Sequence, residues 1–368
     1  MTSMLLRRDD VIVGVDTHKD EHAAVLLDGL GGELAELFIP ATLEGFAQLL
    51  AFCLEHVGPA GCLYGFGVEG TGSYGIGLAR FLRRQGHQVH EVHRPPRKGD
   101  RRLSGKSDTI DAEHAARQVL AGAKTAVPKT ADGAVESLRL LKVARDTAVK
   151  ARTTAMVALK ATLVTAEDQL RAELEPLTDY KLIAACAALE SAPSLAAPDA
   201  AMAHVLGTLA RRWLHLHEEI KVHSRHLKIQ TKAVAPHLVE AVGIGPDIAA
   251  EMLITAGDNT DRVRSEAALA KMCGACPIPA GSGRTNGRHR LNRGGNRQAN
   301  AALYRAIIVR MRWHQPTIGY VNRRTAEGLS KREIIRCLKR YLAREIYHLL
   351  PEPAALTVPP PNPLKDVA

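Results

Sequence analysis

Alternating runs of apolar and polar residues divide the first part of the chain into short strands and helices. Brief apolar or alternating stretches, typical of strands, separate stretches in which apolar residues recur every three or four positions, as in helices. The order β-β-β-α-β-α-β predicts a mixed sheet with an antiparallel edge, in which the first and fourth strands lie side by side. The predicted strands cover 11–15, 22–27, 33–39, 63–68 and 88–92, and the predicted helices cover 43–56, 76–84 and a stretch beginning near 108.

The middle of the chain has the composition of long helices. Residues 134–206 contain no glycine and are rich in alanine, leucine, lysine and arginine. Apolar residues recur near heptad spacing over 138–159, but Arg145 and Arg152 interrupt this seam. A second helical stretch, 202–230, is expected to return antiparallel. The pattern fits a coiled-coil arm that oligomerises and, equally, a plain helical bundle.

The last third of the chain begins with a turn between helices. The segment "VGIGPDIAAEML" places Gly243 and Gly245 before a proline and an alanine-rich helix, as in a helix-hairpin-helix turn. Amides at such a helix N-terminus can hold a phosphate, although a tight turn fits the pattern as well. The proline-rich end predicts disorder. We therefore expect an α/β domain (10–125), a helical or coiled-coil region (130–235), a mainly helical domain (236–350) and a disordered tail (351–368).

The charge of the chain favours a polyanionic partner. Its 368 residues carry a formal net charge of +10, and residues 284–312 hold eight arginines and no acid. This excess favours nucleic acid over a membrane surface. The N-terminal residues do not read as a signal peptide, and no apolar run is long enough to span a bilayer. Six scattered cysteines are typical of reduced thiols.

Four carboxylates end predicted strands or open a predicted helix. Asp16 ends the first strand, and Glu69 ends the fourth, before a glycine-rich turn. Asp108 and Asp111 are three residues apart and share one helix face. Because the strand order brings all four to one edge of the sheet, they predict a site for Mg²⁺ or Mn²⁺ that could act on a phosphodiester. Each acid alone would be an ordinary strand end or helix cap.

A basic loop precedes the last two of these acids. Residues 94–106 carry six cations around the single acid Asp100, and two prolines prevent a helix at its start. Beside a metal site, such a loop would guide a phosphate backbone, while a solvated charged loop is the alternative. The candidate contacts are Arg97, Lys98, Arg101, Arg102 and Lys106.

A serine between two glycines lies in the most basic segment. Gly281 and Gly283 would let a ligand approach the backbone and would expose the Ser282 hydroxyl. The GxSxG elbow of hydrolases is absent and the surroundings are cationic, so attack on phosphorus is the chemistry that fits. A flexible loop that only binds the backbone is the alternative. The candidate side chains around the serine are Arg284, Arg288, His289, Arg290, Arg293 and Arg297.

Five motifs, in order over residues 10–345, resemble those of the insertion-sequence 110 family of transposases, which are RNA-guided serine recombinases. They are "VGVDTHKD", "VEGTGSYG", "GKSDTIDA", "GIGPDIAAEML" and "SGRTNGRHRLNRGGNRQANAAL". The resemblance implies a RuvC-like, RNase H-type α/β domain, a helical coiled-coil insertion and a mainly α C-terminal transposase domain. It implies that Ser282 attacks DNA to form a covalent phosphoserine link. It also implies a metal-binding tetrad of Asp16, Glu69, Asp108 and Asp111.

The same resemblance implies the partners. Donor and target DNA would be the substrates, and a structured guide RNA from the element would pair with both, so that the protein reads shape and backbone. In a homo-oligomer, a dimer or tetramer, the acidic site of one protomer would complete the serine site of another. Such a protein would lie in the bacterial cytoplasm, associated with the nucleoid. Two alternatives remain, a RuvC-like endonuclease without a covalent serine step and a nonenzymatic nucleic-acid binder.

Overall fold

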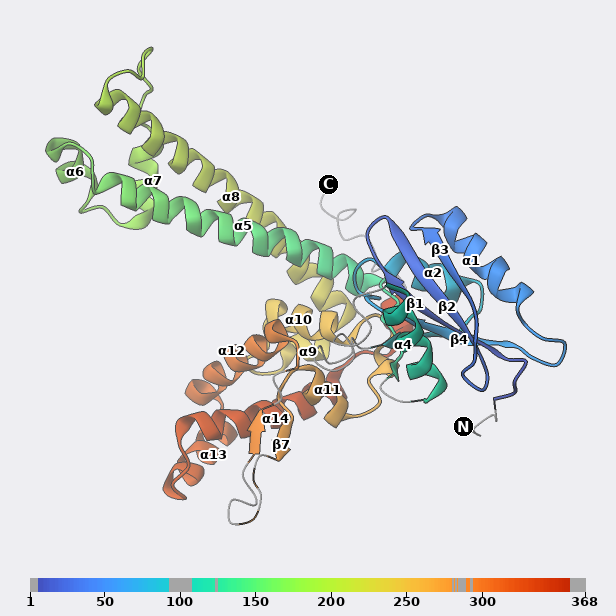
Figure 1. Ribbon diagram of the computed structural model, residues 1–368. Coiled ribbons are helices and arrows are strands. Elements are labelled where there is room, and N and C mark those ends of the chain that lie inside the picture. The colour runs from blue at the N-terminus through green and yellow to red at the C-terminus, as the bar shows by residue number, and fades with distance from the viewer. Residues whose placement is uncertain are drawn as a thin grey trace. The chain divides into compact units, whose positions relative to one another are not determined.

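A computed structural model of the protein places the chain in two units, an N-terminal unit (Met1–Ala131) and a C-terminal unit (Asp132–Ala368) (Figure 1). Each unit has its own hydrophobic core. The structure describes residues 6–92, 108–122, 125–279, 281, 283, 289–291 and 294–357.

Six strands form one mixed sheet in the N-terminal unit, in the order β3-β2-β1-β4-β5-β6. The first three strands are antiparallel neighbours, whereas β4 runs parallel to β1 and β5 runs parallel to β4. The predicted adjacency of the first and fourth strands is therefore confirmed, and a two-residue edge strand, β6, is added. The strands are β1 (Val11–Thr17), β2 (Glu21–Asp28), β3 (Glu33–Pro40), β4 (Leu63–Val68), β5 (Val89–Val92) and β6 (Thr125–Ala126).

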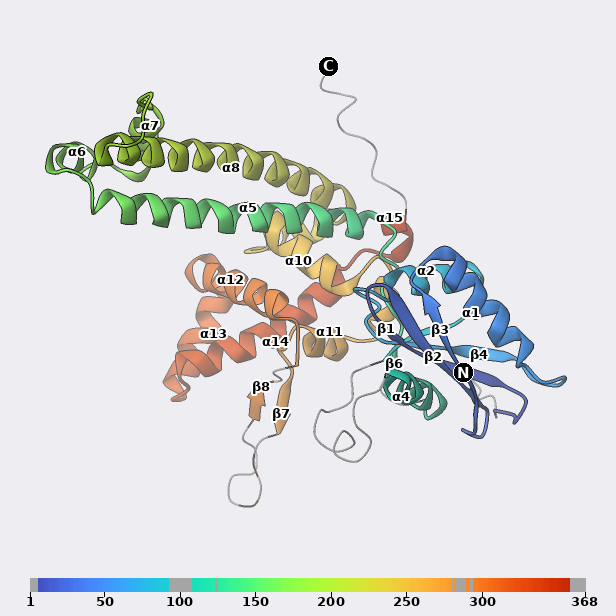
Figure 2. The ribbon, with the colours of Figure 1, turned by 45° about the horizontal axis from the view of Figure 1, so that its top comes forward.

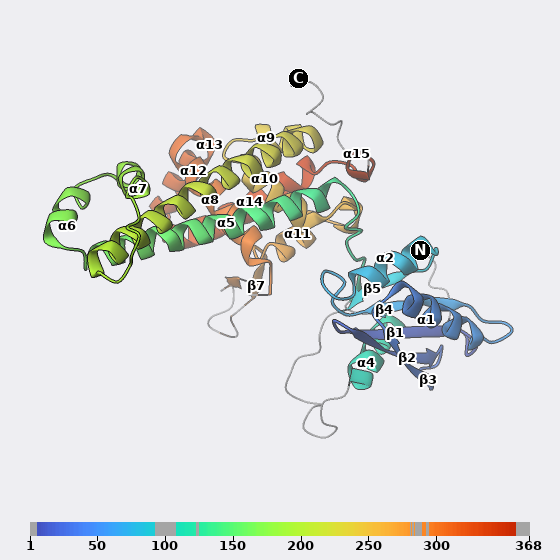
Figure 3. The ribbon, with the colours of Figure 1, turned by 90° about the horizontal axis from the view of Figure 1, so that it is seen from above.

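Helices cover both faces of this sheet, which explains the unbroken apolar run of β1. Alternate residues of a strand point to opposite faces, so Val13 packs with α1 and α2, and Ile12 packs with α4. Figure 3 shows α1 and α2 on one side of the strands and α4 on the other. The helices are α1 (Leu43–Glu55), α2 (Ile76–Arg84) and α4 (Asp108–Leu120).

Two long helices of the C-terminal unit, α5 (Ala134–Leu163) and α8 (Pro198–Val234), lie side by side (Figures 1 and 2). Arg145 donates to Ser224 Oγ at 3.1 Å, and Arg152, seven residues later, lies 2.9 Å from Nδ1 of His217, seven residues earlier. The pair is therefore antiparallel, as predicted. The arginines that interrupt the heptad pattern form polar contacts between the helices. The short helices α6 (Asp168–Leu174) and α7 (Asp179–Ala187) lie at the far end.

The remaining helices share one hydrophobic core with the base of the long pair. Leu138 of α5 and Leu227 of α8 belong to the same core as Leu253, Leu303 and Leu342. Residues 132–357 thus form one unit where the sequence predicted two domains. The elements are α9 (Pro236–Glu240), α10 (Pro246–Ala256), a 3₁₀ turn (Thr260–Arg262), α11 (Glu266–Met272), β7 (Pro277–Pro279), β8 (His289–Leu291), α12 (Arg297–Trp313), α13 (Gln315–Ala326), α14 (Lys331–Leu349) and α15 (Pro353–Thr357).

The predicted disordered tail begins too early at residue 351. Residues 353–357 form α15, and Leu356 is fully buried in the core of the C-terminal unit. Thr260 Oγ1 also donates a hydrogen bond to the carbonyl oxygen of Pro351 at 2.8 Å. Proline composition predicted disorder, but one buried leucine and one hydrogen bond order this segment. No helix in the described part of the chain combines the length and apolar character needed to cross a bilayer.

Candidate functional site

Asp16 and Glu69 are neighbours at one edge of the sheet. Val15 pairs with Val68 in the parallel register of β1 and β4, so the residues that follow them lie side by side. The Glu69 amide donates to the carbonyl oxygen of Val15 at 3.0 Å and continues this ladder. Both acidic residues are buried, with 5% of Asp16 and 7% of Glu69 exposed. Strand ends at the switch point of an α/β sheet are where ligands usually bind.

The turn after Glu69 is held to the end of β1. Thr17 Oγ1 donates to the carbonyl oxygen of Glu69 at 2.9 Å. Gly70 follows at φ +64°, where a Cβ would lie 3.1 Å from both Ser73 Oγ and Thr17 Oγ1. Glycine allows this backbone conformation without strain. The backbone at Glu69 is therefore fixed on both sides.

Two glycines let α4 lie directly on the strands that carry these acids. A Cβ on Gly14 would lie 2.0 Å from the carbonyl oxygen of Ala112, and one on Gly67 would lie 2.7 Å from that of Ala115. These distances exclude any side chain, so the helix backbone contacts the sheet. This packing holds Asp108, in the first turn of α4, near the end of β1. The hydrophobic pattern of the sequence does not predict this role of the strand glycines.

His18 joins the acidic site, which the sequence analysis also missed. Its Nε2 lies 3.2 Å from Asp16 Oδ2 and 3.4 Å from Asp108 Oδ1, and one ligand atom from each residue lies within 4.8 Å of the others. Residues two positions apart at a strand end lie on one face, so the spacing of Asp16 and His18 is a sequence signal that could have identified this histidine. Glu69 and Asp111 lie outside this group among the described residues, Glu69 directly after β4 and Asp111 three residues further along α4.

The donor atoms of this cluster suit a hard divalent cation. Asp16 and Asp108 both approach one imidazole nitrogen, so their negative charges converge on a small volume. Carboxylate oxygens are the ligands that Mg²⁺ and Mn²⁺ prefer, and an imidazole is tolerated better by the softer transition metals. The buried carboxylate of Glu69 adds to the negative charge at this edge. The residues present therefore fit a bound divalent ion.

Many of the basic candidates belong to segments that the structure does not describe. These residues, together with the candidate nucleophile, lie outside the described residues: Arg97, Lys98, Arg101, Arg102, Lys106, Ser282, Arg284, Arg288 and Arg293. Three candidates are described. His289 and Arg290 lie in β8, and Arg297 is the first residue of α12. All three line one cavity of about 720 Å³.

The glycines of the predicted helix-hairpin-helix turn differ in their surroundings. Gly243 has φ +78°, and a Cβ there would lie 2.9 Å from the carbonyl oxygen of Ala306, so it faces α12. Arg310 donates to the neighbouring carbonyl of Val242 at 2.6 Å. Gly245 caps α10 and has open space around its Cα. Only the second glycine thus leaves room for a ligand on its side-chain face.

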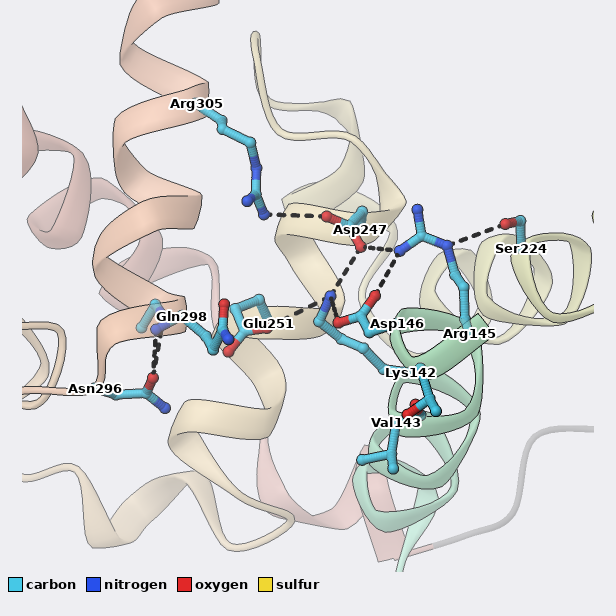
Figure 4. A network of polar contacts seen from close by, with 12 residues as sticks. Lys142, Val143, Arg145, Asp146, Ser224, Asp247, Glu251, Asn296, Gln298 and Arg305 are labelled. Atoms are coloured by element: carbon cyan, nitrogen blue, oxygen red, sulfur yellow. Dashed lines mark hydrogen bonds and ion pairs between the residues drawn. The ribbon is translucent and has the colours of Figure 1, made fainter. Parts of the chain in front are cut away.

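An acid in the first turn of α10 contacts cations from two other helices, α5 and α12 (Figure 4). Asp247 accepts hydrogen bonds from Lys142 at 2.9 Å, Arg145 at 2.7 Å and Arg305 at 3.1 Å. Although burial opposes it, the ammonium of Lys142 lowers the pKa of Asp247. Burial raises the pKa of Glu251, whose Oε2 lies 3.6 Å from the Lys142 ammonium nitrogen. Helix N-termini favour negative charge, which suits Asp247 to the first turn of α10. Its contacts with α5, and the contact of Arg145 with Ser224 of α8, join α10 to the two long helices.

An α/β sheet with carboxylates gathered at its strand ends, in a chain that also contains a helical unit with a basic cavity, is typical of a class of nucleic-acid-processing proteins. Residues 13–166 match a family model described as Transposase, for the DEDD transposases of IS110. Residues 235–322 match a second model described as Transposase IS116/IS110/IS902 family. The chain belongs to the IS110 family of transposases. The first match contains all four candidate acids, and the second contains Ser282.

A curated relative comes from Streptomyces clavuligerus and is described as the insertion element IS116 uncharacterized 44.8 kDa protein. It is 26% identical to this chain over 155 residues. The match covers 42% of this chain and 39% of the relative. The chain therefore spans well under half of the relative that it matches.

Proposed function

We propose that this chain is a transposase whose N-terminal unit cleaves DNA at a divalent-metal centre formed by Asp16, Glu69, Asp108 and Asp111. The observation that carries the proposal is the convergence at the ends of β1 and β4. Asp16 and Glu69 are buried neighbours there, and His18 Nε2 lies within 3.4 Å of carboxylates on both β1 and α4. The strand order and the position of these acids support the RuvC-like, RNase H-type fold that the motif resemblance implies.

The chain would hold Mg²⁺ or Mn²⁺ through the carboxylates of these four residues. A bound ion would act as a Lewis acid on the oxygens of a phosphodiester. The protein's own contribution is to fix the ligands before the ion binds. Thr17 and Gly70 hold the backbone at Glu69, and Gly14 lets α4 carry Asp108 to the strand end. Preorganised ligands of this kind need little rearrangement on binding.

Ser282 is proposed as the nucleophile of strand transfer. Its Oγ would form a bond to phosphorus while the bond from phosphorus to one deoxyribose oxygen breaks, and that oxygen would leave as a hydroxyl with the serine proton. The strand is then joined to the protein as a phosphodiester, which the hydroxyl of another strand can attack in the reverse sense. The arginines near the serine in sequence would stabilise the charge on phosphorus. They include Arg284, Arg288, Arg290, Arg293 and Arg297.

The proposed partners follow from the family and from the charge of the chain. Donor and target DNA would be the substrates, and a structured RNA encoded by the element would select them by base pairing. The net charge of +10 supports binding to both polyanions. The helix-hairpin-helix turn would contact a phosphate at Gly245, whose surroundings are open. The active form is proposed to be a homo-oligomer in which acidic and serine sites of different protomers combine.

The experiment combines the protein with the RNA and DNA ends of its own element and separates the products under denaturing conditions. We expect Mg²⁺-dependent cleavage and a covalent protein–DNA adduct whose linked residue maps to Ser282. Asp16→Asn and Glu69→Gln should abolish both products, whereas Glu36→Gln, an exposed acid on the edge strand β3, should not. Ser282→Ala should abolish the adduct. Cleavage that survives Ser282→Ala would instead identify a RuvC-like endonuclease that uses water.

A further inference from the structure

A basic cavity lies between β8, α12 and α14 in the C-terminal unit. Its volume is about 720 Å³. One face of α12 contributes residues three to four positions apart, including Arg297, Asn300 and Tyr304, and α14 contributes Arg336 and Lys339. Within the described residues, every charged side chain on its walls is a lysine or an arginine. Such a cavity attracts an anion.

Lys339 is buried in the wall of this cavity with a neutral partner only. It is 7% exposed, and its ammonium donates to Asn300 Oδ1 at 2.7 Å. The ammonium also lies 5.3 Å from the centre of the Tyr304 ring. Burial lowers its pKa, and among the described residues no carboxylate pairs with it. A buried charge without a counter-ion destabilises a fold, so its presence here points to a ligand that supplies the negative charge.

Asn300 is held so that its oxygen must face this lysine. Its Nδ2 donates to the carbonyl oxygens of Cys273 at 2.9 Å and Gly274 at 3.2 Å. The amide orientation is therefore set by two acceptors, and Oδ1 is left to accept from Lys339. The wall beyond Gly274 is equally fixed, because a Cβ on Gly295 would lie 2.1 Å from the Gly274 nitrogen. The Asn300 amide oxygen is fixed and carries no net charge, so it orients the Lys339 ammonium without neutralising its charge.

A second buried lysine of the same unit shows the contrast. Lys142 is 8% exposed, yet it lies within 4 Å of three carboxylates, those of Asp146, Asp247 and Glu251 (Figure 4). Its positive charge is satisfied inside the protein. Lys142, which connects α5 to α10, is thus surrounded by acids. Lys339 has none among the described residues and opens onto a cavity instead.

We propose that this cavity is a phosphate-binding subsite for a single-stranded segment of nucleic acid, with Lys339 and Arg336 binding the phosphate and Tyr304 stacking on a base. The assignment of the phosphate to nucleic acid rests on the proposed function. Tyr304 is 46% exposed and lies beside the basic wall, and basic grooves with exposed aromatic rings are typical of single-strand binding sites. Inorganic phosphate is the other source of the same chemistry.

The test measures binding of a short labelled single-stranded oligonucleotide by fluorescence anisotropy at several salt concentrations, without divalent metal. We expect Lys339→Met to weaken binding about tenfold and to reduce the salt slope by about one. The matched control is Lys331→Met, which removes an exposed charge at the start of the same helix and should change affinity less than twofold. Arg336→Gln, an exposed cavity residue, provides a second variant and should also weaken binding.

Thermal unfolding distinguishes a ligand site from a structural lysine. Lys339→Met should raise the melting temperature, because it removes a buried charge without a counter-ion. A lower melting temperature with unchanged oligonucleotide binding would overturn the proposal. Protection by inorganic phosphate that is lost in Lys339→Met, with unchanged oligonucleotide affinity, would assign the cavity to free phosphate and contradict it. The binding test measures no cleavage and is independent of strand transfer. If the wild-type protein failed to cleave and join DNA, that result would contradict the proposed function and not the phosphate subsite.

Discussion

Gly14 of β1 and Ala112 of α4 approach so closely that no side chain fits between strand and helix. A Cβ on Gly14 would lie 2.0 Å from the carbonyl oxygen of Ala112 and 2.3 Å from the Ala116 nitrogen. Both obstacles are backbone atoms, which cannot rotate away. The position of Asp108, four residues before Ala112 at the start of the same helix, therefore depends on the absence of a side chain at Gly14.

Gly14→Ala should destabilise the N-terminal unit and weaken its metal site together. The methyl group would push α4 off the strand, at a cost of about 1–3 kcal/mol in the free energy of unfolding. Displacement of Asp108 should also lower Mn²⁺ affinity, measured by calorimetry. The control is Gly72→Ala, where a Cβ has open space and stability should change by less than about 0.5 kcal/mol. Equal stability of the two variants would contradict the close packing.

His18→Ala should reduce the affinity of the acidic site for Mn²⁺. The imidazole lies within 3.4 Å of both Asp16 and Asp108 and offers a nitrogen ligand that suits Mn²⁺ better than Mg²⁺. We expect a loss of about tenfold for Mn²⁺ and a smaller loss for Mg²⁺. Titration of both ions by calorimetry measures this difference. The control is His56→Ala, at the C-terminal end of α1, which should leave Mn²⁺ affinity unchanged. An unchanged Mn²⁺ affinity in His18→Ala would show that His18 is not a ligand.

Asp247→Asn should destabilise the C-terminal unit at neutral pH. The change leaves Lys142 without its nearest carboxylate, and Lys142 is only 8% exposed. We expect a loss of about 1–3 kcal/mol, less than for a fully buried ion pair, because the Asp247 side chain is about one third exposed. Urea unfolding measures it, with Asp261→Asn, in the exposed part of the 3₁₀ turn, as control. Equal urea midpoints for the wild type and Asp247→Asn would show that the Asp247 network adds no stability.

The same residue should set part of the acid sensitivity of the unit. The pKa of Asp247 is lowered in the folded state, so the unfolded state binds the proton more readily. Its stabilisation is therefore complete above its ordinary value of 3.8 and is lost as the pH falls through the folded pKa. Asp247→Asn should lack this loss. Unfolding midpoints measured at pH values on both sides of 3.8 should converge between wild type and variant at the acid end, and a constant difference would contradict the linkage.

Leu356→Ala should destabilise the C-terminal unit although it lies in the proline-rich end. The side chain is fully buried in the core that also contains Val135 of α5 and Leu253 of α10. A leucine removed from such a core costs about 2–5 kcal/mol. Chemical unfolding measures the loss, and Glu352→Ala, an exposed neighbour, should leave the midpoint nearly unchanged. If Leu356→Ala unfolded at the same denaturant midpoint as the wild type, the packing of this segment would be contradicted and a disordered tail from residue 351 would be favoured.

The sequence by itself determined the first five strands of the large sheet, their adjacency at β1 and β4, and the position of Asp16 beside Glu69. Hydrophobic periodicity and element order are local properties, and a β-β-β-α-β-α-β pattern leaves few sheet topologies open. Adjacent parallel strands then place Asp16 beside Glu69, as the structure has them. The return of α8 along α5 followed in the same way from two long helical stretches.

Only the tertiary structure decided which residues complete these sites. His18 reaches Asp108 across ninety residues of chain, and Lys339 meets Asn300 from another helix, so no local pattern shows either contact. Tertiary contacts distinguish both residues, because the exposed His18 lies close to two carboxylates and the buried Lys339 contacts none among the described residues. The end of the chain was misjudged for the same reason, since proline content predicts local conformation and Leu356 is ordered by distant contacts.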